Sequence, residues 1–201
     1  MATLLDQPRV KPLDIGSWDT ELKKSSWIPE DVTEKSQLPE MMAKVFNVTA
    51  TLANHPVLAK SWNQFAMHIM GTNTLEARLR EIAIIRIGYL NKSDYELSQH
   101  AWIGEMSGLT KEEVIRITEG PSAPGWSDIE ALVIRATDEL KESSLVSTET
   151  WNALSESGFS QHQMMDLVFT IGQYNMVSWA LNSLGVQLDD GLPSFFDALG
   201  K

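Results

Sequence analysis

Three side chains that can exchange protons lie within a stretch of twenty residues: Glu81, Glu96 and His100. Glu96 and His100 are four residues apart, which places them on one face of a helix. An imidazole titrates near neutral pH, so it serves as a general acid or base without a large pKa shift, and flanking carboxylates fix its tautomer and stabilise its charged form. The pattern indicates a proton-transfer site in which His100 carries the proton.

Each of these residues also has a structural explanation, and a lone histidine such as His100 is more often a hydrogen-bonded core residue than a catalyst. Ser93 and Glu96 form the Ser-x-x-Glu pattern of a capping box, which accounts for Glu96 without catalysis. Glu81 and Arg86 lie in a stretch that is apolar on both sides, where a buried ionised group needs a partner, and each fits a structural ion pair. From the residues alone, both interpretations stay open.

The composition excludes several classes of chemistry. The chain has no cysteine, so it has no disulfide, no thiolate metal ligand and no cysteine nucleophile. It has no Gly-rich phosphate loop and no Gly-x-Ser-x-Gly motif. Its net charge of −11 disfavours binding to nucleic acid or to an anionic membrane. A metal site formed by Glu81, Glu96 and His100, with His68, is an open alternative, although we expect no metal and no cofactor.

Helix signals dominate the rest of the chain. Residues 1–37 carry scattered proline and glycine and are predicted to form an extended arm that covers the body or a neighbouring subunit. Helices are predicted over 39–54, 56–71 and 74–90, and no stretch keeps the two-residue alternation of a strand. We therefore predict an all-α fold with one compact domain over residues 38–201. Four later helix starts carry capping boxes, at Ser93/Glu96, Thr110/Glu113, Ser127/Glu130 and Ser160/Gln163, and helix ends are expected at Gly108, Gly120, Gly158 and Gly185.

Two segments of the chain share a weak sequence pattern. Residues 80–89 and 165–174 each combine an acidic residue, an aliphatic run, a glycine and a nearby tyrosine. This similarity is consistent with a duplicated helical half, and also with chance likeness between two buried helices.

The block around Glu81 resembles the carboxymuconolactone decarboxylase and alkyl hydroperoxidase D-like family. The resemblance rests on the spacing of Glu81, Ser93, Glu96 and His100, on Tyr95, and on the helix end that follows; the motif-bearing half is about 56–120. In the peroxidase branch, the positions of Ser93 and Glu96 carry a Cys-x-x-Cys pair. Both thiols are missing here, which excludes thiol peroxidase chemistry. The resemblance implies an all-α homo-oligomer with sites close to subunit contacts.

The resemblance also implies a function. In the decarboxylase branch, such groups assist the loss of carbon dioxide from an unsaturated lactone and place a proton on the resulting carbon. We expect a cofactor-independent acid–base enzyme that catalyses decarboxylation, isomerisation or lyase chemistry on a small carboxylated, lactone or carbonyl substrate. The alternative is a catalytically silent helical oligomer that serves as a binding or scaffold protein. The expected catalytic residues are His100, Glu81 and Glu96, and the expected substrate-binding residues are Arg86, Tyr95 and His68.

The sequence also bears on location. The first residues lack the basic and apolar regions of a secretory signal. The longest apolar run, residues 82–90, is too short to span a bilayer and contains Arg86. We therefore expect a cytoplasmic protein with a small-molecule substrate and no membrane or nucleic-acid partner.

Overall fold

The computed structural model describes residues 5–200, and within that range its regular structure is entirely helical, as predicted. No helix of this part of the chain combines the length and the apolar character that a membrane span requires. The elements in chain order are η1 (Ile15–Ser17), α1 (Thr20–Ser25), η2 (Lys35–Gln37), α2 (Glu40–Ala43), α3 (Phe46–Leu52), α4 (Pro56–Met67), η3 (His68–Thr72), α5 (Ala77–Leu90), α6 (Asp94–Met106), α7 (Lys111–Ile117), α8 (Asp128–Ser143), α9 (Thr148–Glu156), α10 (Gln161–Leu184) and α11 (Phe195–Ala198).

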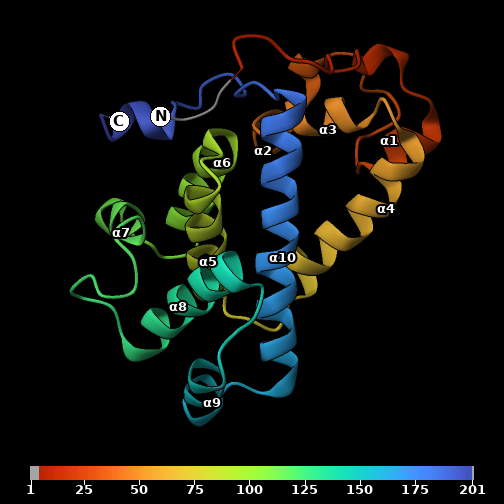
Figure 1. Ribbon diagram of the computed structural model, residues 1–201. Helices are drawn as coiled ribbons and strands as arrows, with labels where there is room; N and C mark the ends of the chain where they lie inside the picture. The colour runs from red at the N-terminus through yellow and green to blue at the C-terminus, as the bar shows by residue number, and fades with distance from the viewer. Residues whose placement is uncertain (1–4, 201) are drawn as a thin grey trace.

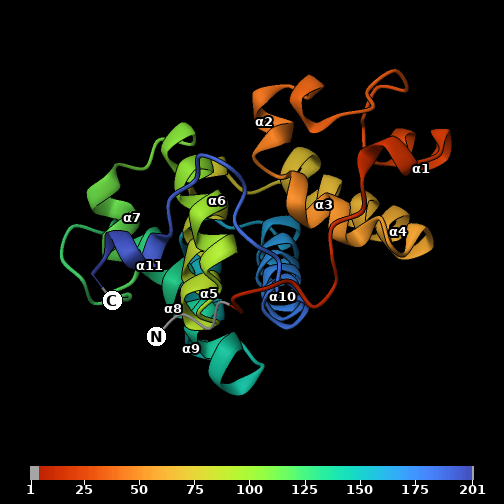
Figure 2. The same cartoon turned by 90° about the horizontal axis from the view of Figure 1, so that it is seen from above.

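Helix α5 is the centre of the larger hydrophobic core. It packs against α6, α8 and α10, and most of its side chains are buried. A helix that is apolar on all sides is stable only when other helices cover it, which explains this central position. The long helix α10 runs between the α5–α6 pair and the α3–α4 pair (Figures 1 and 2). The two segments with similar sequence patterns thus lie on two helices that pack together.

Most of the predicted helix boundaries are confirmed. The capping boxes of Thr110, Ser127 and Ser160 are present at the starts of α7, α8 and α10. Gly185 ends α10 with a left-handed backbone (φ 71°), a conformation that glycine adopts without strain.

The capping box predicted at Ser93 is wrong. Ser93 precedes α6, but its side chain makes no capping bond, and its buried Oγ has no hydrogen-bond partner among the described residues. The Ser93 N–H donates to the Gly88 carbonyl at 3.0 Å, in the tight turn that joins α5 to α6. Because this backbone bond already satisfies the Ser93 amide, Glu96 is not needed as a cap.

The helix predicted over residues 39–54 is interrupted. Helix α2 ends at Ala43 and α3 begins at Phe46. The backbone groups that the break releases bond to side chains distant in sequence: Gln99 Nε2 donates to the Lys44 carbonyl, and the Asn47 N–H donates to Asp189 Oδ1 at 3.0 Å. These tertiary partners stabilise a break that no local sequence signal indicates.

The described part of the N-terminal arm is more structured than predicted. It contains η1, α1 and η2, and its apolar side chains form a second core with α3 and α4. Trp18 stacks on Phe46 with ring centroids 6.1 Å apart, and α1 packs against α4. The arm therefore folds back on its own chain and covers the outer helices (Figure 2).

Candidate active site

His100 lies between two carboxylates. Its Nδ1 is 2.6 Å from Glu81 Oε2, and its Nε2 is 3.1 Å from Glu96 Oε1. The other oxygen of Glu81 accepts a 3.1 Å hydrogen bond from Arg80 Nε. Glu81, Glu96 and His100 are all buried. The structure thus brings together the three residues that the sequence selected as catalytic, in the order Glu81, His100, Glu96.

The close approach of α5 and α6 depends on two glycines. A Cβ atom added to Gly88 on α5 would lie 3.3 Å from Glu96 Cγ. A Cβ atom added to Gly104 on α6 would lie 3.1 Å from Ile85 Cδ1 and 3.0 Å from Leu109 Cδ1. Because all three distances are shorter than ordinary van der Waals contact, the glycines allow the helices to pack closely. This packing sets the distance from Glu81 on α5 to His100 on α6.

The surroundings of His100 favour its charged form. Burial by itself lowers the pKa of His100, but the charge and hydrogen bond of Glu81, followed by those of Glu96, outweigh it and raise the pKa to about 9. At neutral pH His100 is therefore an imidazolium. Its ring meets the ring of Tyr174 edge to face, with centroids 4.8 Å apart. Burial, together with the charges of Glu96 and Glu81, raises the pKa of Tyr174 well above its usual value, so Tyr174 stays a neutral phenol.

Glu96 and His100 line a cavity of about 450 Å³. This size lies within the usual range for small-molecule sites. The cavity is lined by the arm near Trp27, by α2, α3 and α4, and by α6 and α10. Its lining is mostly apolar, with Glu96 and His100 as its charged residues, and among residues 5–200 no arginine or lysine takes part in it. The aromatic and methionine side chains of the wall are Trp27, Met41, Met42, Phe46, Trp62, Met67, Met70, Tyr95, Trp102, Met106 and Tyr174.

Tyr95 contributes to the cavity wall, but its hydroxyl group is already engaged. The hydroxyl donates to Asp189 Oδ2 at 2.6 Å and accepts a 3.3 Å bond from the Val48 N–H. Burial, then the charge of Asp189, raises the pKa of Tyr95 well above its usual value. The predicted substrate-binding role of Tyr95 is therefore restricted to its ring, and the hydroxyl positions the wall.

The other two predicted substrate-binding residues lie outside this cavity. Arg86 forms a bidentate pair with Asp138, at 2.6 and 2.9 Å, and its Nη1 donates to the carbonyls of Ile117 and Thr118. These bonds direct the guanidinium toward α7 and α8. His68 Nε2 lies 2.8 Å from Asp166 Oδ1, and its Nδ1 lies 3.0 Å from Thr72 Oγ1. Neither residue lines the cavity that contains His100.

The geometry does not suit the metal site considered above. Among residues 5–200, no group of three or more histidine, aspartate or glutamate side chains is arranged to hold a metal ion. Both nitrogens of His100 already face carboxylate oxygens, and His68 pairs with Asp166 instead.

Several site residues lack a usable sequence signal. Arg80 has no distinguishing sequence signal, yet its side chain is only 12% exposed and bonds to Glu81. Tyr174 and Gln173 enter the site from α10, more than seventy residues after His100. Trp27 enters from the arm. Only the three-dimensional packing brings these segments to the cavity.

Comparisons with known proteins bear on the fold and on the family of this segment. Residues 56–139, which contain the three central residues, match the model of the carboxymuconolactone decarboxylase family. No curated protein matches the chain. A peroxidase-related protein from Ralstonia eutropha JMP134 with an alkylhydroperoxidase AhpD core superposes with a TM-score of 0.68 at 18% identity, over 78% of this chain and 90% of that one. An uncharacterized peroxidase-related protein from Silicibacter sp. TM1040 superposes with a TM-score of 0.66 at 13% identity, over 94% of this chain and 96% of that one.

The solved structures show a shared fold, and the family model covers the segment that carries the proton-exchanging residues. The chain therefore has the AhpD-like helical fold, and its residues 56–139 match the model of the carboxymuconolactone decarboxylase family.

Proposed function

We propose that this protein is a cofactor-independent acid–base enzyme of the carboxymuconolactone decarboxylase type. One observation carries the proposal: an imidazolium held between two buried carboxylates forms part of the wall of a cavity large enough for a substrate. A proton donor with a raised pKa at the edge of a cavity is a characteristic arrangement of acid–base catalysis. We infer decarboxylation or isomerisation of a carboxylated, lactone or carbonyl compound.

His100, Glu96 and Glu81 have different roles in the proposed reaction. In a decarboxylation, the bond between the substrate carbon and its carboxylate breaks, carbon dioxide leaves, and the electron pair remains on carbon as an enolate. The His100–Glu96 pair then delivers one proton to that carbon, and solvent restores the proton to His100. In an isomerisation, the same pair removes a proton from one carbon and returns it to another. The Glu81 carboxylate bonds to His100 and Arg80, and acts by holding the imidazole oriented and charged.

The cavity favours an enzyme over the alternative of a silent scaffold. A scaffold needs no open volume beside His100, and a histidine packed on all faces would have supported it. Instead, His100 and Glu96 both border the cavity. Self-association and a cytoplasmic location stay predictions from the sequence.

Proton transfer to carbon is tested by isotope exchange. Wild-type protein is incubated in D₂O with a panel of β-keto acids, unsaturated lactone carboxylates and ketones, and deuterium on carbon and released carbon dioxide are measured. His100→Gln is expected to lower turnover by roughly 10²–10⁴-fold with unchanged helical content. His162→Gln, which alters an exposed histidine, is the matched control and should keep the wild-type rate. Equal rates in wild type and His100→Gln would remove His100 from the mechanism.

A further inference from the structure

We call the cavity of about 450 Å³ that Glu96 and His100 line the main cavity. Its wall away from His100 is unsuited to a small, multiply charged substrate. It is built from side chains such as Phe46, Trp62, Met70, Trp102 and Ile103. Among the described residues, His100 is the only cation that lines it, and the lining residues Ser26, Thr49, Asn63, Gln99 and Gln173 are polar but neutral. A second or third carboxylate on a substrate would enter this apolar volume without a partner, which is strongly unfavourable. The lining therefore matches one polar group on an otherwise apolar molecule.

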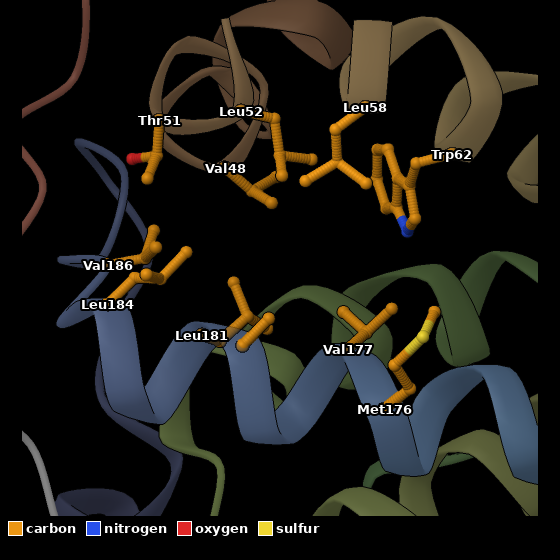
Figure 3. A pocket seen from close by; sticks show the side chains of 11 residues that line it. Val48, Thr51, Leu52, Leu58, Trp62, Met176, Val177, Leu181, Leu184 and Val186 are labelled. Atoms are coloured by element: carbon orange, nitrogen blue, oxygen red, sulfur yellow. The ribbon is translucent and has the colours of Figure 1, made fainter. Parts of the chain in front are cut away.

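A second, smaller cavity of about 140 Å³ lies beside the first, between α3–α4 and α10. Its lining is apolar apart from Thr51. Figure 3 shows Val48, Leu52, Leu58 and Trp62 projecting from α3 and α4 toward Leu181 and its neighbours on α10. Apolar cavities of this kind hold water poorly and accept apolar groups. We call this cavity the side pocket.

The side pocket is adjacent to the main cavity. The two share Val48, Trp62, Val177 and Leu181 as wall residues. An apolar group that extends from a molecule in the main cavity therefore has a second apolar volume next to it, bordered by these same four side chains. Because the two cavities share these walls, an extension of the molecule bound in the main cavity is the occupant that the side pocket fits.

We propose that the substrate is a largely apolar, ring-containing compound with a single carboxylate or carbonyl group. The polar group lies at His100 and Glu96, the ring lies against the aromatic and methionine wall, and an alkyl or ring extension enters the side pocket. This inference rests on the proposed function for the position of the polar group. It goes beyond that function by excluding small polycarboxylates and by assigning a role to the side pocket.

A binding series tests this assignment without turnover. The probes are benzoate, 4-ethylbenzoate, 4-butylbenzoate and benzene-1,2,4-tricarboxylate, and the dissociation constants are measured by isothermal titration calorimetry on the full chain. Affinity is expected to rise by about threefold to fourfold for each methylene group that becomes buried. The tricarboxylate is expected to bind more weakly than benzoate. Flat affinity along the alkyl series, or tightest binding of the tricarboxylate, would overturn the proposal.

Variants that fill the side pocket test whether the alkyl chain of the probe binds there. Ala180 lines the side pocket but not the main cavity, so Ala180→Leu is expected to reduce the gain from benzoate to 4-butylbenzoate at least fivefold and to leave benzoate binding unchanged. Leu184→Phe, at a second position confined to the side pocket, provides the same test if Ala180→Leu does not fold. An undiminished gain in a folded variant would overturn the role of the side pocket.

The proposed substrate class and the proposed acid–base mechanism can be contradicted independently of each other. Loss of the chain-length effect contradicts the substrate class, whereas wild-type isotope exchange by His100→Gln contradicts the acid–base mechanism. Neither result determines the other, because the binding series requires no proton transfer.

Discussion

His100 Nδ1 lies 2.6 Å from Glu81 Oε2, and Glu81 is completely buried. The two residues come from neighbouring helices joined by a tight turn, so the backbone of α5 and α6 fixes their relation. Arg80 occupies the other oxygen of Glu81, and Glu96 faces the second nitrogen of His100. His100 is thereby held as an imidazolium at the wall of the cavity.

The charge on His100 links the stability of the fold to pH. The pKa of His100 is raised from an ordinary value of 6.5 to about 9. A raised folded-state pKa contributes stability that is fully present below the unfolded value near 6.5 and is lost as pH rises through about 9. Glu81→Gln removes the largest source of this shift. We therefore expect the free energy of unfolding to differ most between wild type and Glu81→Gln near pH 6, and less at pH 10.

Urea unfolding of both proteins at several pH values measures this difference. Glu105→Gln, an exposed acidic residue on α6, is the control and should follow wild type across the range. A difference between wild type and Glu81→Gln that stays constant from pH 6 to pH 10 would contradict the assigned charge of His100.

Ser93→Ala is expected to change stability little. Ser93 Oγ is buried and makes no hydrogen bond with the described residues, so its removal costs no capping bond. The chemically identical change Ser160→Ala removes a cap that accepts the Gln163 N–H, and is expected to lower the free energy of unfolding by about 1 kcal/mol. Denaturant unfolding of the two variants gives the comparison. A larger loss for Ser93→Ala than for Ser160→Ala would show that Ser93 does cap α6.

Arg86→Met tests whether Arg86 acts in structure or in binding. The change leaves Asp138 without its bidentate partner, and breaking a buried pair in this way costs about 3–5 kcal/mol. We expect a loss toward the lower end, because the Asp138 side chain is 28% exposed. The affinity for benzoate should not change. Arg135→Met, on the same helix as Asp138, breaks an exposed 3.7 Å pair with Glu149 and should cost less than about 1 kcal/mol.

If folded Arg86→Met binds benzoate more weakly and keeps its stability, Arg86 takes part in binding. Thermal unfolding and calorimetric titration of the same samples separate the two outcomes.

The local features of the fold were predictable because their signals are local. The capping boxes of Thr110, Ser127 and Ser160 lie within four residues, and each precedes a helix as predicted. Glu96 and His100 share a helix face for the same reason. The Ser93–Glu96 capping box did not form: the Ser93 N–H that Glu96 would accept bonds to the Gly88 carbonyl, in a tight turn that the capping pattern does not reveal, and the Ser93 side chain makes no capping bond.

The distant features were not predictable from one sequence. The partner of Arg86 is fifty-two residues away on α8, and nothing in the α5 stretch distinguishes Asp138 from a substrate anion. The cavity combines Trp27 of the arm with Tyr174 of α10, and no periodicity relates these positions. The lining that indicates the substrate class therefore appears only when the chain is folded.

The protonation state of His100 is the most direct test of the central claim. Heteronuclear NMR of ¹⁵N-labelled protein follows both ring nitrogens of His100 between pH 5.5 and 10, with His100→Gln to assign the signals. We predict that both nitrogens are protonated at pH 7.5, with a titration midpoint near 9 that falls in Glu81→Gln. A wild-type midpoint at or below 6.5, unchanged in Glu81→Gln, would contradict an imidazolium held between Glu81 and Glu96.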